Sequence, residues 1–258
     1  MGYFESNNTP LSRGELKTVN SISMKISEQF KLLLDFIRYN IKIIFANKFI
    51  YFLIAAFAFF LMVTGIMLFT DSSPDEADIY GSLLFPGILI LFYPVIYNIQ
   101  SDKDTRMLEI LFGIPNYRYK VYLVRFALSV SLLVLIMCLM SWITVFAIIR
   151  ISVFHMVYEL MYCLLFLASL AFLLATLIKN ASGAAVLMVI IGLVFLILSE
   201  PLESSKWNIF LNPFDVPGDM SYSIWQNVLS QNRMMLVAGS IISILWSLIN
   251  MQKRERFV

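Results

Sequence analysis

The stretch from Phe49 to Phe69, FIYFLIAAFAFFLMVTGIMLF, contains no charged side chain. Only Thr64 and Gly65 interrupt its apolar character. A helix needs about 20 apolar residues to cross the hydrocarbon core of a bilayer. This stretch therefore predicts a membrane-spanning helix, and it decides the fold class of the chain.

The composition of the whole chain also indicates a membrane protein. Of its 258 residues, 60% are hydrophobic and 14% are charged, whereas soluble domains have roughly 45–50% apolar and about 25% charged residues. The mean hydropathy of +0.81 leaves too little polar surface to coat a globular domain. The net charge of +2 gives no electrostatic support for a nucleic-acid partner, so none is expected.

Five further apolar runs follow along the chain and predict an all-α integral membrane protein. The second run contains Pro86 and Pro94, which predict kinks and a helix packed among neighbours that satisfy the freed carbonyls. Lys179, Asn180 and Ser182 form a tight polar turn between the fourth and fifth runs. The six expected spans are 49–69, 83–100, 122–149, 155–178, 183–199 and 232–250.

The segments around the spans differ in character. Residues 1–26 are polar and contain no apolar stretch of signal-peptide length. Residues 27–48 predict an amphipathic helix lying in the membrane interface, because charged side chains recur on one face. The alternative is a helix of a small soluble N-terminal domain. An outer loop is expected at 200–231, and a basic tail at 251–258.

The distribution of basic residues predicts the orientation. With the N-terminus inside the cell, 16 of the 19 lysine and arginine residues fall in inner segments. Cytoplasmic segments carry such an excess of lysine and arginine, so both termini are expected in the cytoplasm. The acidic loop from Asp71 to Asp78 is then external, and the three remaining basic residues, Arg150, Lys206 and Arg233, are counted outside.

The inner segment 101–120, SDKDTRMLEILFGIPNYRYK, predicts a short helix of about two turns. Asp104 or Thr105 can cap its start, and Gly113 followed by Pro115 ends it. Such a helix would be a rigid knob for docking a cytoplasmic partner, although a solvated loop with a surface helix fits the same spacing. Its apolar face would carry Met107, Leu108 and Leu111, and another face Arg106 and Glu109.

The order of residues from Asp102 to Pro115, DKDTRMLEILFGIP, resembles the coupling helix of type 2 ABC exporter permeases. That family has an "ERE-x-GT-LE-x-LL…P" pattern there, and this chain has Thr105-Arg106 where the family often has Gly-Thr. The ending from Lys253 to Val258, KRERFV, resembles the family's short "RRE-x-F" ending. The layout of an interfacial helix, six spans and a long outer loop before the last span is similar as well.

This resemblance implies a permease subunit that moves substrate outward by alternating access in the bacterial plasma (inner) membrane. ATP and Mg would be bound by a separate ABC ATPase subunit in two copies, because no phosphate-binding G-x-x-x-x-G-K-[ST] loop occurs in this chain. The chain itself is then neither an enzyme nor the holder of a cofactor, and a second, identical permease copy makes a homodimer. The residues expected to couple it to the ATPase are Asp104, Thr105, Arg106, Met107, Leu108, Glu109, Leu111, Phe112, Gly113 and Pro115.

His155 and Glu159 stand four residues apart at the outer end of the fourth span, so they share a helix face. They are candidates for a proton-sensitive outer gate, and an interfacial polar pair is the simpler alternative. Apart from Glu159 the spans carry essentially no ionisable side chain, which argues against an ion-coupled carrier.

The outer loop 200–231 contains Pro201, Pro213, Pro217 and Gly218 among apolar patches. By the resemblance, it would form two short helices that dip back into the membrane and cap the exit path. The alternative is a surface loop anchored by the interfacial aromatic residues Trp207, Phe214, Tyr222 and Trp225.

Other classes of function find less support in the sequence. Cys138 and Cys163 both lie in apolar runs and are interpreted as core residues, and no metal site is expected. The 14 methionines have no spacing typical of metal ligands. The second hypothesis is a non-transporting membrane scaffold that recruits a cytoplasmic partner through the inner segment.

Overall fold

The structure, a computed structural model, describes residues 49–70, 74–104, 118–178, 180–218 and 220–252. All of them belong to one compact unit, Ile44–Val258. The predicted interfacial helix 27–48 and polar segment 1–26 lie outside the described residues, as do residues 253–258 of the basic tail.

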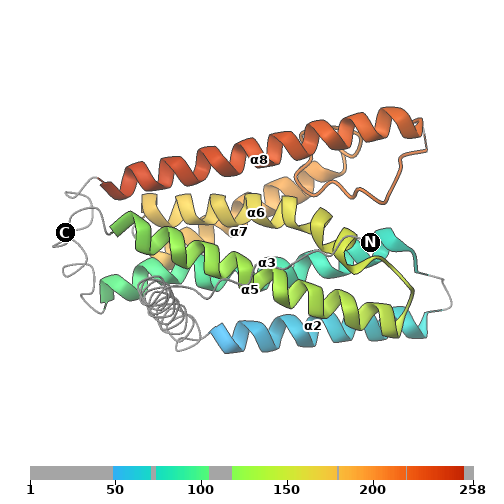
Figure 1. The fold of residues 1–258 in the computed structure, drawn as a ribbon, viewed down its shortest axis with the longest axis horizontal. Coiled ribbons are helices and arrows are strands. Elements are labelled where there is room, and N and C mark those ends of the chain that lie inside the picture. The colour runs from blue at the N-terminus through green and yellow to red at the C-terminus, as the bar shows by residue number, and fades with distance from the viewer. Residues whose placement is uncertain (1–48, 71–73, 105–117, 179, 219, 253–258) are drawn as a thin grey trace, which may run out of the picture. The chain divides into compact units, whose positions relative to one another are not determined.

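Within these ranges the chain forms six helices and no strand (Figure 1). All six helices are long and apolar enough to cross a membrane. The chain is therefore a multi-pass membrane protein with six candidate spans, as the hydropathy pattern predicted. The helices are α2 (Phe49–Phe69), α3 (Glu76–Asp104), α5 (Arg118–Ala147), α6 (Val153–Ile178), α7 (Ala181–Ser199) and α8 (Tyr222–Gln252).

The start of α3 corrects the predicted boundary of the second span. Residues 76–78, which we expected in an external loop, form its first turn instead. The backbone N–H of Asp78 donates to Asp75 Oδ1 at 2.9 Å, and the N–H of Asp75 donates to Asp78 Oδ2 at 3.2 Å. This reciprocal capping satisfies free N–H groups at the helix start, where negative charge also opposes the helix dipole favourably. Glu76 and Asp78 thus belong to the helix and Asp75 caps it, so the predicted external loop is shorter than we expected.

Two further boundaries differ from expectation. α3 continues as one helix through Pro86 and Pro94 to Asp104, and it is the most buried of the six candidate spans. α8 begins at Tyr222, so the last ten residues of the predicted loop 200–231 are helical. At the start of α7, Asn180 Oδ1 accepts from the N–H groups of Ser182 and Gly183, which explains the polar turn after α6.

α6 is the central helix of the unit and contacts α3, α5, α7 and α8, while α2 packs mainly against α3. α2 and α7 are the least buried spans. Their exposed side chains are apolar, as for Ile54, Ile66, Val189 and Ile197. In a bilayer such faces contact lipid at no desolvation cost.

The contact between α6 and α8 uses small and polar residues. Gly239 of α8 lies so close to α6 that a Cβ atom there would stand 2.7 Å from Phe166 Cε2. Nearer the ends of the two helices, Ser247 Oγ lies 3.4 Å from Thr176 Oγ1. Small residues let membrane helices approach closely, and hydroxyl groups bond across the contact. Further buried serines on α8 are Ser240 and Ser243.

The order of these contacts shows how the helices run. Arg233 meets Glu159 near the start of both helices, and Ser247 meets Thr176 further along both. α6 and α8 therefore run in the same direction (Figure 1). We call the end where α3, α6 and α8 begin the Glu159 end. Phe49, Asp104, Arg118 and Gln252 belong to the opposite end.

Candidate functional site

Most of the predicted coupling residues lie outside the described part of the chain, namely Thr105, Arg106, Met107, Leu108, Glu109, Leu111, Phe112, Gly113 and Pro115. Asp104, expected as a cap of the coupling helix, is the last residue of α3. The helix ends that flank this segment are described. α3 ends at Asp104 and its neighbour α5 begins at Arg118, so both lie at the end opposite Glu159.

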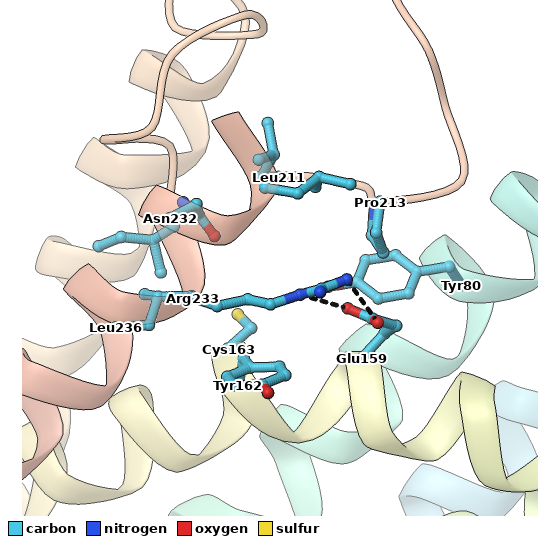
Figure 2. Close-up of a pocket in the computed structure, with 11 residues that line it drawn as sticks. Tyr80, Glu159, Tyr162, Cys163, Leu211, Pro213, Asn232, Arg233 and Leu236 are labelled. Carbon is cyan, nitrogen blue, oxygen red and sulfur yellow. Dashed lines mark hydrogen bonds and ion pairs between the residues drawn. The ribbon is translucent and has the colours of Figure 1, made fainter. Parts of the chain in front are cut away.

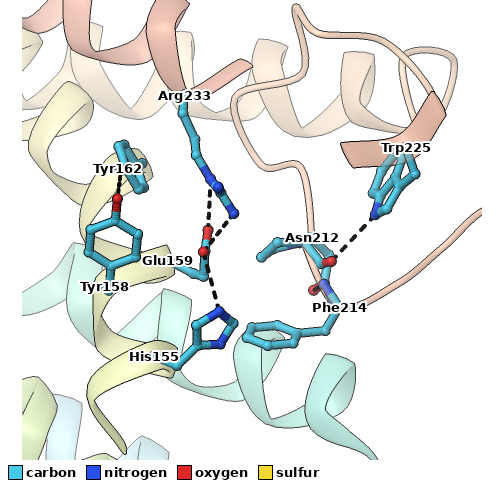
Figure 3. Close-up of polar contacts among 9 residues, drawn as sticks. His155, Tyr158, Glu159, Tyr162, Asn212, Phe214, Trp225 and Arg233 are labelled. Atoms are coloured by element: carbon cyan, nitrogen blue, oxygen red, sulfur yellow. Dashed lines mark hydrogen bonds and ion pairs between the residues drawn. The ribbon is translucent and has the colours of Figure 1, made fainter. Parts of the chain in front are cut away.

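The Glu159 end holds a charged pair between α6 and α8 (Figure 3). Arg233 donates from Nη2 to Glu159 Oε1 at 2.6 Å and from Nε to Glu159 Oε2 at 3.2 Å. The Glu159 side chain is 4% exposed, whereas that of Arg233 is 30% exposed. A guanidinium that engages both carboxylate oxygens compensates a charge that would be costly to leave alone inside a membrane protein. The acid of the pair is thus buried, whereas the arginine is partly exposed at the surface.

His155 approaches the same carboxylate from the preceding turn of α6. Its Nε2 lies 3.7 Å from Glu159 Oε1, the oxygen that also accepts the short bond from Arg233. The His155 side chain is 59% exposed. Protonated His155 would therefore place a second positive charge beside the oxygen that Arg233 already occupies.

Arg233 is the functional residue that the sequence analysis missed, because we counted it among the basic residues on the outer side and did not pair it with Glu159. It lies inside the candidate span Tyr222–Met251 and is paired with an acid 74 positions earlier. A usable signal was present, because an acidic residue inside a span needs a cation. Spacing could not choose among the several basic residues that stand in the spans or near their ends. Among these are Lys120, Arg125, Arg150 and Lys179.

Tyrosine side chains surround the pair. The Arg233 guanidinium lies over the Tyr162 ring, 5.7 Å from its centroid. The hydroxyl groups of Tyr158 and Tyr162 are hydrogen bonded to each other along α6. Tyr80, from α3, is fully buried on the other side of Glu159. An aromatic face attracts a cation, so the Tyr162 ring favours the position of Arg233.

The segment 200–221 folds over the Glu159 end. Its described residues form turns, and α8 begins after them, so the two short helices expected from the family resemblance are absent in this part. Asn212 Nδ2 donates to the carbonyl oxygen of Ala77 in α3 at 3.0 Å. The centroid of the Phe214 ring lies 6.0 Å from that of Tyr80. It lies 5.5 Å from the centroid of the His155 ring (Figure 3). The segment therefore contacts both α3 and α6 beside the charged pair.

Two of the four aromatic residues expected as interfacial anchors differ from that expectation, since one is buried and the other half-buried. Trp225 is 1% exposed and packs with Leu211 and Leu229, while its Nε1 points toward the carbonyl oxygen of Pro213 at 3.4 Å. Phe214 packs inward, as described above. Trp207 and Tyr222 are exposed, and their role as interfacial anchors stays a prediction.

The residues around the pair line a small pocket (Figure 2). Its space of about 10 Å³ is close to the least that one water molecule requires. It is lined by Tyr80, Glu159, Tyr162, Cys163, Ile209, Leu211, Pro213, Leu229, Asn232, Arg233 and Leu236. Cys163 is fully buried here, and its thiol is free. In this conformation the space is too small for anything larger than a water molecule.

A wider cleft of about 330 Å³ opens between segment 200–221 and the start of α8. Three acidic residues, Glu200, Glu203 and Asp215, share its wall with the buried face of Trp225. No group of three potential metal ligands occurs in the described part of the chain.

No family model, curated protein or solved structure matches the chain. Among the described residues of the Glu159 end, both carboxylate oxygens of Glu159 accept from Arg233, and Oε1 also lies 3.7 Å from His155 Nε2. The arrangement can hold three helices and segment 200–221 together. It does so through charged and hydrogen-bonding side chains that water could also solvate.

Proposed function

We propose that this chain is the permease subunit of an ABC exporter in the bacterial plasma membrane, working as a homodimer with two copies of a separate ABC ATPase. The observation that carries the proposal is the sequence 102–115, which predicts a capped helix with an apolar face and resembles a coupling helix. ATP and Mg would belong to the ATPase, and the chain's own role would be mechanical.

The six-span bundle supports this reading. The 13 residues from 105 to 117 join the ends of two neighbouring helices, α3 and α5, at one end of the bundle. A short element held between two long helices can transmit a push from a partner into the bundle. The end that carries it is also rich in lysine and arginine, which favours the cytoplasmic side.

The Glu159 end then faces outward in this proposal. A closed, charge-paired arrangement covered by segment 200–221 fits the resting state of an exporter, which must not leak. His155 and Glu159 are the residues we propose at this outer gate, as the sequence spacing suggested, together with Arg233.

The proposal is tested by disrupting the coupling face. Leu108→Asp places a charge where an apolar anchor would meet the ATPase, and loss of one such anchor typically costs about 2 kcal/mol. That corresponds to roughly 30-fold weaker association. We expect the variant to insert normally, while ATPase co-purification from membranes and ATP-dependent export fall together.

Arg118→Ala is the control, since this residue lies beyond Pro115 at the start of α5 and should change neither readout much. Wild-type levels of ATPase co-purification and export in the Leu108→Asp variant would refute the coupling role. The scaffold hypothesis makes a different prediction, because a scaffold would bind its partner without any cargo-stimulated ATP hydrolysis.

A further inference from the structure

Two consecutive residues of α8 connect different parts of the Glu159 end. Asn232 donates both amide hydrogens to segment 200–221, to the carbonyl oxygens of Lys206 at 2.8 Å and Asn208 at 2.7 Å. The next residue, Arg233, donates to Glu159 in α6. Successive helix residues point about 100° apart, so α8 binds the covering segment with one side chain and the bundle with the next.

Segment 200–221 and the start of α8 consequently form one structural piece, which we call the end unit (residues 200–233). Besides the Asn232 bonds, a small separate apolar cluster of Leu211, Trp225 and Leu229 holds it together. The polar groups within it are well satisfied: the Asn208 side chain accepts from the N–H of Phe210 and donates to the carbonyl oxygen of Ser199 at the end of α7. Internal contacts of this kind favour movement of the end unit as a whole.

The end unit also contacts α3 and α6. These contacts include the Glu159–Arg233 pair, the bond from Asn212 to Ala77, and the contacts of the Phe214 ring with Tyr80 and His155. In addition, Arg233 lies over the Tyr162 ring, and Ile209 packs in the main apolar core. Further along α8, the close approach of Gly239 to Phe166 is a point of contact about which the helix can tilt. The pair stands six residues before that point.

We propose that the Glu159–Arg233 pair is a releasable lock, which holds the end unit against α3 and α6 and opens by tilting α8 about the Gly239–Phe166 contact. An ion pair suits this task because water can solvate both charges once they part, and this recovers the desolvation cost of the closed state. Arg233 is partly accessible even in the closed state, because its side chain is 30% exposed. Opening would expose Cys163, Tyr80 and Leu236, which the closed arrangement buries. The part that this lock plays in export rests on the proposed function, but the lock itself does not.

Cys163 provides a reporter that the chain already contains. The experiment uses the full chain in native membranes with Cys138→Ala, and measures the rate at which a small methanethiosulfonate reagent labels Cys163. We expect slow labelling with the pair intact and labelling at least tenfold faster in Arg233→Gln and in Glu159→Gln. The charge-reversed double variant, Glu159→Arg with Arg233→Glu, should label more slowly than either single variant.

The matched control is Arg150→Gln, which removes an exposed base from the connection between α5 and α6 at the same end of the bundle. It should leave the labelling rate unchanged. Arg233→Lys keeps the charge but loses the two-pronged geometry, so it should give an intermediate rate. The amount of inserted protein is measured for each variant, and hydrogen exchange of residues 200–233 gives a second readout that needs no cysteine.

The lock is refuted if Arg233→Gln accelerates neither Cys163 labelling nor hydrogen exchange of the end unit, or if the reversed pair behaves like the single variants. Labelling is measured without ATP, so its result does not depend on ATP-driven transport. A lock that behaves as described in a chain that shows no ATP-dependent export would uphold this inference and overturn the proposed function.

Discussion

A lone acidic side chain in an apolar helix has to be paired, and Glu159 shows how the fold provides the partner. The spacing of His155 and Glu159 was evident from the sequence because it is local. The bond that dominates the site joins Glu159 to Arg233, 74 positions away. The stronger contact depends on α6 and α8 being neighbours, and no local pattern encodes that.

Asn232 gives a prediction at the scale of one residue. Asn232→Ala removes two hydrogen bonds to backbone carbonyl oxygens and leaves Lys206 and Asn208 without these donors. Buried groups left unsatisfied cost about 1–3 kcal/mol each, so the melting temperature of the purified protein in detergent should fall. Asn227→Ala, an exposed amide on the same helix, should leave it nearly unchanged. Equal melting temperatures for the two variants would show that the Asn232 bonds are not stabilising.

At the scale of elements, capping and packing determined where helices begin and how closely they approach. The acidic residues before α3 seemed to mark a loop, yet two of them form a reciprocal cap. In α8, the polar residues before Arg233 are helical from Tyr222 onward. We attribute this to Trp225 and Leu229, which pack with Leu211 in a separate apolar cluster. Hydropathy alone shortens both helices, since it counts these polar residues as outside the span.

The close approach of α6 and α8 predicts different effects for two glycine substitutions. Alanine favours a helix over glycine by about 1 kcal/mol at either site. At Gly239 the new methyl group would meet the Phe166 ring at 2.7 Å, and overpacking costs about 1–3 kcal/mol. Gly239→Ala should therefore lower the melting temperature.

Gly192→Ala in α7 is the matched change, because no atom stands within 4 Å of the added Cβ. It should preserve or raise the melting temperature. If both variants were equally stable, the Gly239 contact would not be as tight as the structure has it, and α8 would have room to shift.

At the scale of the whole molecule, six helices bring Phe49 and Gln252 to the same end of the bundle. Which end faces the cytoplasm is a prediction from the basic residues. In a background of Cys138→Ala and Cys163→Ala, Ser72→Cys and Ser204→Cys should react with an impermeant thiol reagent added outside the cell. Asn116→Cys should react only after the membrane is permeabilised. The reverse pattern would overturn the orientation and, with it, the coupling proposal.

The sequence by itself determined that the chain is helical, that it crosses the membrane, and roughly where its six spans lie, because burial in lipid requires long apolar runs that any window of the sequence reveals. Only the tertiary structure decided which polar residues meet: Arg233 with Glu159, Asn232 with Lys206 and Asn208, Asn212 with Ala77. These contacts join residues 24 to 135 positions apart. They depend on the neighbours that each helix acquires, and lipid-facing and protein-facing apolar side chains look alike in the sequence, so hydropathy cannot name those neighbours.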